Sequence, residues 1–161
     1  ALALDSDRAE LCRRTFTGKN YEVSTMEIDR DTDSYMIFTV NEILSKYKDA
    51  QLFLIIGSDM FLSFHKWYKY REIMKKCTLC VMSREDEDTV KALRSYAFST
   101  LHIYMPSNEA NGIIISPSSP LEISSTEIRQ KISAGEDVSD VLTKEAYEFI
   151  KERGMYGYAK K

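Results

Sequence analysis

A continuous apolar run, Leu52-Phe53-Leu54-Ile55-Ile56, is the feature that most constrains the fold of this chain. Its length suits a strand, and its lack of alternation predicts a central parallel strand that is covered on both faces. Gly57-Ser58-Asp59 follows at once, as expected of a turn at the carboxyl end of such a strand. Because parallel strands are joined by crossovers, the run predicts helices on either side of it.

The rest of the sequence alternates between helical and strand patterns. Apolar residues at helical spacing, with helix caps, predict helices near 5–18, 36–48, 61–74 (with a break around His65 and Lys66), 85–97, 124–135 and 143–154. Strand patterns occur at 21–28, 78–82, 101–105 and 113–115. This alternation predicts an α/β fold with a doubly wound parallel sheet, formed as a single domain over residues 1–161.

Composition limits the classes of partner. The chain has 161 residues, 43% hydrophobic and 29% charged, which is ordinary for a globular protein with one proper core. A net charge of −3 gives no basic excess for nucleic acid, and no apolar run is long enough to cross a membrane. Three cysteines, an odd count without a secretion signal, favour the cytoplasm. The C-x-x-C pair Cys77 and Cys80 indicates two small apolar residues in a buried strand, with a zinc or redox site as the alternative.

A polar helix start lies near the carboxyl end of the chain. Ser124 and Glu127 have the spacing of a capping box, and Ser125 and Thr126 fall in the first turn. Arg129 lies one turn beyond Ser125 on the same helix face. Open amides and a guanidinium together favour an anion such as phosphate. The alternative is an ordinary helix cap with a solvated arginine.

A second group of candidates follows the apolar run. Gly57 would let a ligand approach the backbone, and the Asp59 carboxylate would accept hydrogen bonds from ribose hydroxyls. The alternative for both is a tight turn and a helix cap. Trp67 would stack on a flat heteroaromatic ring or pack in the core. His65 and His102, the two histidines, are expected at the surface. In a parallel sheet, the carboxyl ends of strands form the ligand-binding edge, where both groups of candidates are expected.

Four motifs occur along the chain in this order: Ile55-Ile56-Gly57-Ser58-Asp59-Met60, then Trp67 with the strand ending at Arg84, then Ile123-Ser124-Ser125-Thr126-Glu127-Ile128-Arg129, then Tyr147-Glu148-Phe149-Ile150 with Gly154-Met155-Tyr156. Together they resemble bacterial nicotinate-nucleotide adenylyltransferases, from Arg8 to Tyr156. The I-S-S-T-x-I-R element is specific to the nucleotidyltransferase superfamily, and the G-x-D and tryptophan spacing to its pyridine-nucleotide branch. The resemblance implies a Rossmann-like nucleotidyltransferase fold.

The resemblance also implies roles for the candidate residues, with ATP and nicotinate mononucleotide as substrates and Mg²⁺ as cofactor. It assigns the ATP phosphates to Ser124, Ser125, Thr126 and Arg129, with Arg129 as the catalytic donor to the phosphoryl oxygens. It assigns the adenosine ribose to Gly57 and Asp59. It assigns the nicotinate ring to Trp67 and the nicotinate carboxylate to the backbone at Tyr68. No side chain is expected to be a metal ligand, and a homo-oligomer remains open.

Two departures from the family pattern bear on this expectation. The family carries near its amino terminus an H-x-G-H motif whose histidines meet the α-phosphate, and this sequence lacks it. The resemblance therefore predicts a leading strand–helix segment before Ala1, with a non-catalytic nucleotide-binding relic as the alternative. The family also reads S-Y-T-x-D-T where Met36 and Phe38 replace the threonine and the aspartate. Because a thioether cannot donate a hydrogen bond, nicotinamide mononucleotide is an alternative acceptor, as is phosphopantetheine.

Overall fold

The computed structural model describes residues 3–84, 86–118 and 123–158. It divides the chain into two compact units: unit 1 is built from the described parts of residues 1–30 and 121–161, and unit 2 from those of residues 31–120. Each unit is taken by itself below. The single domain expected over residues 1–161 stays a prediction.

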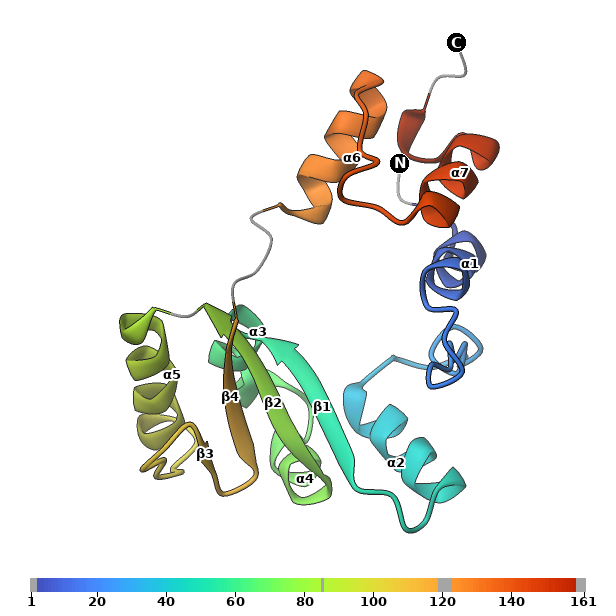
Figure 1. Cartoon of the computed structure of the whole chain (residues 1–161). Helices are drawn as coiled ribbons and strands as arrows, with labels where there is room; N and C mark the ends of the chain where they lie inside the picture. Colours follow the sequence, from blue (N-terminus) through green and yellow to red (C-terminus); the bar gives the residue numbers. More distant parts are fainter. Residues whose placement is uncertain (1–2, 85, 119–122, 159–161) are drawn as a thin grey trace. The chain divides into compact units, whose positions relative to one another are not determined.

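Unit 2 contains a sheet with the strand order β1-β2-β4-β3 (Figure 1). The strands are β1 (Leu52–Gly57), β2 (Cys77–Arg84), β3 (Glu109–Ala110) and β4 (Ile113–Ser118). β1 pairs in parallel with β2, and β2 in parallel with β4, whereas the short β3 is antiparallel to β4. The predicted α/β fold with a mainly parallel sheet is confirmed.

Helices connect the parallel strands of unit 2. They are α2 (Met36–Lys46), α3 (Ser58–Leu62), the 3-10 turn η1 (Phe64–Lys66), α4 (Tyr70–Lys76) and α5 (Glu87–Ser99). The break expected at His65 and Lys66 is confirmed, because the chain turns through η1 before α4 begins. The Asp86 side chain caps α5 by accepting a hydrogen bond from the Thr89 amide, at 2.6 Å.

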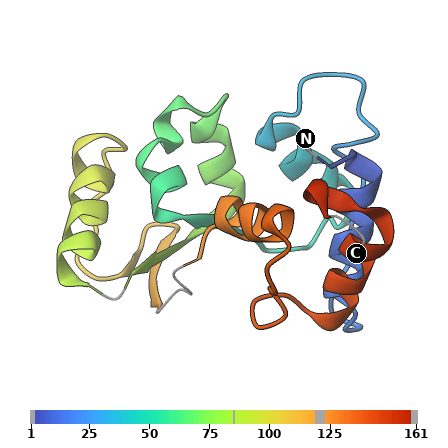
Figure 2. The same cartoon turned by 90° about the horizontal axis from the view of Figure 1, so that it is seen from above.

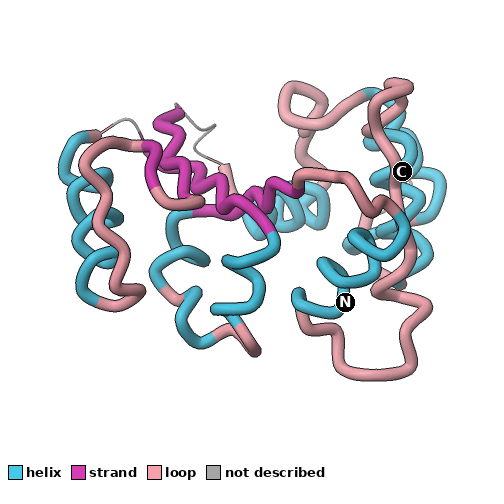
Figure 3. The backbone as a smooth tube through the Cα atoms, turned by 90° about the horizontal axis from the view of Figure 1, so that it is seen from below, coloured by secondary structure: helices cyan, strands magenta, loops and turns pink. Residues whose placement is uncertain are grey.

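The core of unit 2 lies on one face of its sheet. The most deeply buried apolar residues from strands are Leu79 and Val81 on β2, and Ile113 and Ile115 on β4. Against them pack the buried helix residues Phe61, Ile73, Leu93 and Ala97, from α3, α4 and α5. Figures 2 and 3 show these helices beside the strands, outside the plane of the sheet.

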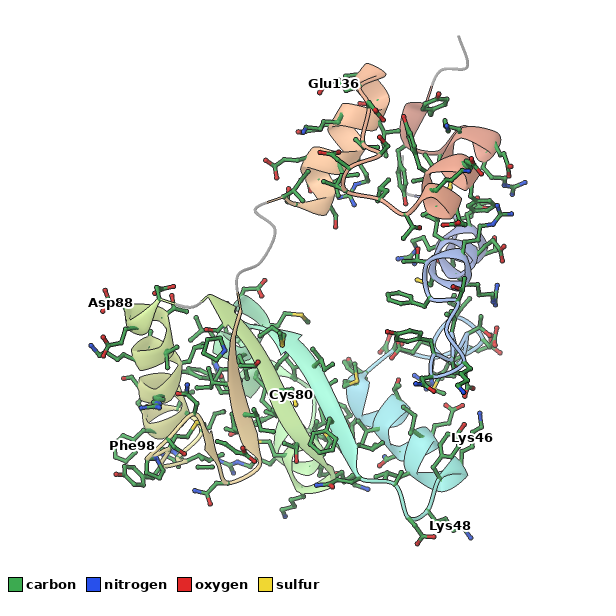
Figure 4. The ribbon with its side chains drawn as sticks, viewed as in Figure 1. Lys46, Lys48, Cys80, Asp88, Phe98 and Glu136 are labelled. Atoms are coloured by element: carbon green, nitrogen blue, oxygen red, sulfur yellow. The ribbon has the colours of Figure 1, made fainter. Side chains whose placement is uncertain are left out.

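The other face of the same sheet is apolar and partly open to solvent. Phe53 is 51% exposed, Ile55 68% and Met82 39%. Ile55 is aligned with Cys80 of β2, so the two side chains share this face. Cys80 is labelled in Figure 4. The expectation that the Leu52–Ile56 run is covered on both faces is therefore wrong for the described residues, where β1 is the edge strand of the sheet. An unbroken apolar run predicts two buried faces but does not supply the covering element.

Two predicted strands are wrong. In 21–28 the chain forms turns: the amides of Ile28 and Asp29 both donate to the Thr25 carbonyl, at 2.8 and 2.9 Å. In 101–105 the Ile103 amide donates to the Ala97 carbonyl of α5 at 2.8 Å, and His102 adopts a left-handed φ of 61°. Both segments alternate as strands do, but their hydrogen bonds go to nearby turns and helix ends.

Unit 1 is helical. It contains α1 (Asp5–Thr15), α6 (Ser125–Ala134), α7 (Lys144–Arg153) and the 3-10 turn η2 (Met155–Gly157). α1 packs against α7, where Arg153 binds Asp7 (Nη2 to Oδ1, 2.9 Å) and the Arg14 guanidinium lies 4.3 Å from the centre of the Phe149 ring. Its core is the buried cluster Ile132, Val138, Phe149, Ile150 and Met155. No helix in the described ranges has the length and apolar character needed to cross a membrane.

Candidate functional site

The start of α6 is the capping box that the sequence predicts. The Glu127 amide donates to the Ser124 hydroxyl at 3.1 Å, and the Ser124 amide donates to the Glu127 carboxylate at 2.7 Å. The helix ends at Gly135, which takes the left-handed conformation (φ 74°). Both predicted ends of this helix are confirmed, and the first turn is held by bonds between residues three apart.

The capping box leaves two amides for an outside acceptor. Those of Ser125 and Thr126 are the first two of the helix and point out of its amino end, where the helix dipole is positive. Within residues 3–84, 86–118 and 123–158, no acceptor meets either amide. Both residues are exposed. This turn can therefore bind an anion through backbone N–H groups.

Arg129 turns back toward the same end of the helix. Its Nη2 donates to the Thr126 hydroxyl at 3.1 Å, and its side chain is half-buried. Accepting this bond still leaves the Thr126 hydroxyl free to donate its own proton. The residues Ser125, Thr126 and Arg129 thus bring two amides, hydroxyl donors and one permanent positive charge to a single turn.

Glu127 is the one acidic residue in the first turn of this helix. Hydrogen bonds from the Ser124 backbone and hydroxyl lower the pKa of the Glu127 carboxyl. The carboxylate is therefore charged at neutral pH and accepts the hydrogen bond of the Ser124 amide. An incoming anion consequently meets the amides of Ser125 and Thr126 rather than that of Ser124.

Gly57 and Asp59 lie in unit 2, where β1 ends and α3 begins. A Cβ added at Gly57 would lie 2.6 Å from the Asp59 carboxylate oxygen Oδ1. Since φ at Gly57 is −75°, its glycine is explained by this close approach and not by backbone conformation. Any other residue at 57 would displace the exposed Asp59 carboxylate from its present position.

Trp67 and Tyr68 lie in the aromatic segment that follows η1. Trp67 is half-buried against the core, with its ring centre 5.1 Å from that of Phe64. Tyr68 is 47% exposed, and its ring centre lies 4.6 Å from that of Tyr35. Phe38 meets both tyrosines edge-on, at 5.9 Å from Tyr35 and 6.2 Å from Tyr68. Unit 2 therefore presents a cluster of aromatic rings, Tyr35, Phe38 and Tyr68, beside Trp67.

The predicted site residues thus fall into two groups, each held together within one unit. The phosphate-binding candidates Ser124, Ser125, Thr126 and Arg129 belong to unit 1, and Gly57, Asp59, Trp67 and Tyr68 to unit 2. That a single nucleotide spans both groups stays a prediction.

The two histidines and the C-x-x-C pair have roles in packing or at the surface. His102 is exposed, whereas His65 is half-buried and its Nδ1 lies 2.9 Å from the Tyr96 hydroxyl. The Cys77 thiol is buried and donates to the Ile73 carbonyl at 3.1 Å, and burial raises its pKa. In the part of the chain that the structure describes, no three His, Cys, Asp or Glu side chains form a metal-binding cluster.

One residue beside the turn was missed from the sequence. Tyr156, in η2, lines with Arg129 the same cavities of unit 1, and its backbone is left-handed (φ 57°, ψ 24°). The signal was its position in Gly154-Met155-Tyr156-Gly157, where both glycines also have positive φ.

Comparison with known proteins places the chain in a family. The model of the cytidylyltransferase-like family matches residues 2–131. The chain belongs to the cytidylyltransferase-like family. This cytidylyltransferase-like chain is an enzyme of the nucleotidyltransferase type, and its family model includes the whole turn from Ser124 to Arg129.

Curated relatives agree with this assignment. A protein of Legionella pneumophila (strain Corby) is 31% identical over 144 residues, which cover 85% of this chain and 68% of the relative. One of Shewanella frigidimarina is 30% identical over 143 residues, covering 84% and 68%. One of Staphylococcus epidermidis is 29% identical over 136 residues, covering 84% and 62%. All three are named probable nicotinate-nucleotide adenylyltransferase, so the resemblance inferred from the motifs is confirmed.

Proposed function

We propose that this chain transfers the adenylyl group of ATP to nicotinate mononucleotide, giving deamido-NAD and pyrophosphate in NAD biosynthesis. The observation that carries the proposal is the turn at the start of α6, where two outward amides and Arg129 converge at the positive end of a helix. The names of the relatives support the choice of substrates.

In this proposal the triphosphate of ATP binds at the α6 turn. The amides of Ser125 and Thr126 donate to phosphate oxygens, and the hydroxyls of Ser125 and Thr126 add donors around them. Ser124 holds the turn in place through its capping bonds with Glu127. Arg129 supplies the charge that balances the phosphates, in a geometry that its bond to Thr126 already prepares. A charge fixed before the reaction stabilises developing negative charge without reorganisation.

The adenosine and the acceptor are assigned to unit 2. The Asp59 carboxylate accepts hydrogen bonds from the adenosine ribose hydroxyls, and Gly57 allows the close approach. The nicotinate ring stacks on Trp67, and the Tyr68 backbone meets its carboxylate. The aromatic cluster of Tyr35, Phe38 and Tyr68 favours the binding of a flat ring in this region, because aromatic rings attract one another in offset and edge-to-face arrangements.

The reaction is an in-line displacement. A phosphate oxygen of the mononucleotide attacks the α-phosphorus of ATP, the new P–O bond forms as the bond to the β-phosphate breaks, and pyrophosphate leaves. Such a step needs alignment and charge stabilisation, and no protein nucleophile. Mg²⁺, which binds mainly through substrate phosphates and water, is expected to enter with ATP. The enzyme is proposed to act in the cytoplasm, as a monomer or a homo-oligomer, without nucleic acid or membrane partners.

The direct test measures turnover of Mg·ATP by the full-length protein with three acceptors offered separately. Release of pyrophosphate together with deamido-NAD from nicotinate mononucleotide is the expected result. Phosphopantetheine as the preferred acceptor would overturn the proposal. Nicotinamide mononucleotide as the preferred acceptor would keep the chemistry but correct the substrate.

Met36 is the position that bears on this last outcome. It lies half-buried at the start of α2, beside the aromatic cluster residue Tyr35. A threonine at 36 would add a hydroxyl able to donate to the nicotinate carboxylate. Met36→Thr is therefore expected to raise the ratio of acid to amide turnover by about 10- to 100-fold, because a hydrogen bond to a charged group contributes about 1.5–3 kcal/mol. Met60→Thr, an exposed methionine on α3, is the matched control.

A further inference from the structure

Two cavities of unit 1 adjoin the Arg129 side chain. One has a volume of about 210 Å³ and the other of about 260 Å³. Arg129 and Tyr156 are the residues that line both. These two residues therefore contribute to the walls of both cavities.

The cavities differ in chemistry. The smaller one is mainly apolar, lined by Leu11, Ile128, Ile132, Leu142, Ala146 and Ile150, with Thr15 and Ser125 as its other polar residues. The larger one is lined by polar side chains, those of Thr126, Gln130 and Ser133. A guanidinium in the first would lose water without gaining a charged partner, whereas in the second it meets the Thr126 hydroxyl at 3.1 Å.

Tyr156 adopts a backbone conformation that disfavours a bulky side chain. Its φ of 57° and ψ of 24° are left-handed, between Gly154 and Gly157, which also have positive φ. Glycine would fit the same backbone without strain. The tyrosine ring instead packs, half-buried, against the cluster that contains Ile132 and Phe149. A tyrosine at this strained backbone position is explained if its ring has a function there.

We propose that Tyr156 is a positioning residue for Arg129, whose ring closes off the apolar cavity and keeps the guanidinium on the Thr126 side, ready for the phosphates of ATP. The inference rests on the proposed function, since it assigns the phosphates to that side. An arginine has many rotamers, so a neighbour that restricts it removes part of the ordering cost of binding. Tyr156 itself need not touch the nucleotide.

The experiment compares Tyr156→Gly, which removes the ring and relaxes the backbone, with Tyr156→Phe, which keeps the ring. Tyr158→Ala is the matched control, because Tyr158 packs against the same cluster but lines neither cavity. Calorimetric titrations use Mg·ATP and, separately, adenosine as probes. We expect Tyr156→Gly to weaken Mg·ATP binding by about 3- to 10-fold, the cost of ordering one long side chain. Tyr156→Phe and Tyr158→Ala should match the wild type, and adenosine binding should not change.

Three outcomes separate this role from simple packing. In an Arg129→Ala background, Tyr156→Gly should have no further effect on Mg·ATP, because the side chain it positions is gone. The ¹⁵N relaxation of the Arg129 Nε–H group should report greater motion in Tyr156→Gly even without nucleotide. Equal weakening in both backgrounds, or an Arg129 signal as rigid as in the wild type, would overturn the proposal. If the wild type does not bind Mg·ATP but Tyr156→Gly still increases the motion of the Arg129 Nε–H group, the phosphate site is refuted. The restriction of Arg129 by Tyr156 is then still supported.

Discussion

The turn at 124–129 and the aromatic segment at 61–70 are held in place in opposite ways. The hydrogen bonds that shape the turn join residues three or four apart: Ser124 with Glu127 and with Ile128, and Arg129 with Thr126. The aromatic segment depends on distant partners. The Tyr68 ring packs at a tilt against that of Tyr35, and the His65 amide donates to the Tyr96 hydroxyl at 3.0 Å.

Because of this difference, binding and stability are expected to respond differently to substitutions in the two regions. An exposed turn that is held by local bonds can lose a side chain while the rest of its unit stays folded. A half-buried ring in the aromatic segment belongs to the core of unit 2, so its loss disturbs the fold as well as any ligand. Substitutions in the two regions should consequently be distinguished by whether stability and binding change together.

The largest effect is expected from Trp67→Ala. Removing this ring, which packs against Phe64, should destabilise unit 2 by about 3 kcal/mol, at the low end for large aromatics because Trp67 is only half-buried. Acceptor binding should weaken as well. Urea denaturation measures the first effect and turnover against acceptor concentration the second. Tyr104→Ala, at an aromatic residue of unit 2 that is 67% exposed and has no proposed role in binding, is the control. An unchanged free energy of unfolding in Trp67→Ala would contradict the proposed difference between the two regions.

Arg129→Ala should show the reverse behaviour. We expect a loss of about 2 kcal/mol in kcat/KM for ATP, the value of one charged phosphate contact, with little change in the free energy of unfolding. Arg129→Lys keeps the charge but loses the planar fork, and should recover part of the activity. Lys131→Ala, which removes a positive charge from the same helix at a residue that lines neither cavity, serves as the control. Steady-state rates that match the wild type in Arg129→Ala would remove Arg129 from the site.

Ser124→Ala tests the cap itself. Loss of the hydroxyl that accepts from the Glu127 amide should cost about 1 kcal/mol of stability in unit 1. The affinity for ATP should fall less than in Arg129→Ala, because the amides of Ser125 and Thr126 remain. Ser133→Ala, whose hydroxyl donates to the Gln130 carbonyl at 2.8 Å in the same helix, is the control. Equal melting temperatures for Ser124→Ala and the wild type would show that the cap contributes nothing.

The smallest effect is a pH dependence at Glu127. Because its pKa is lowered in the folded protein, its contribution is complete above the ordinary value of 4.5 and is lost as the pH falls through the folded value. The melting temperatures of the wild type and Glu127→Gln should therefore differ at pH 7 and converge as the pH falls through the lowered pKa of Glu127. Thermal melts across this range provide the measurement. A difference that grows on acidification would contradict the assigned direction.

Local sequence signals were sufficient to predict the turn at 124–129, but they were insufficient to predict several other features of the structure. The capping box, the end of α6 at Gly135 and the break near His65 follow from residues within one or two turns of each other, and the structure agrees. The strands predicted at 21–28 and 101–105 are wrong because alternation does not determine whether a neighbouring strand is present.

Two further features depend on information that no local pattern carries. The exposure of Ile55 depends on what packs over the second face of the sheet. The left-handed conformation of Tyr156 is stabilised by packing against side chains far away in sequence. The position of Gly57 and Asp59 at the end of β1 could be predicted from the sequence, because both residues follow the strongest strand signal in the chain.

The most direct test of this account is a titration of the ¹⁵N-labelled protein with Mg·ATP, followed by amide chemical shifts. The account predicts that the largest changes fall on the amides of Ser125 and Thr126 and on the Arg129 side-chain N–H, and that adenosine alone does not reproduce them. Saturable ATP binding that leaves these three signals unmoved would contradict it.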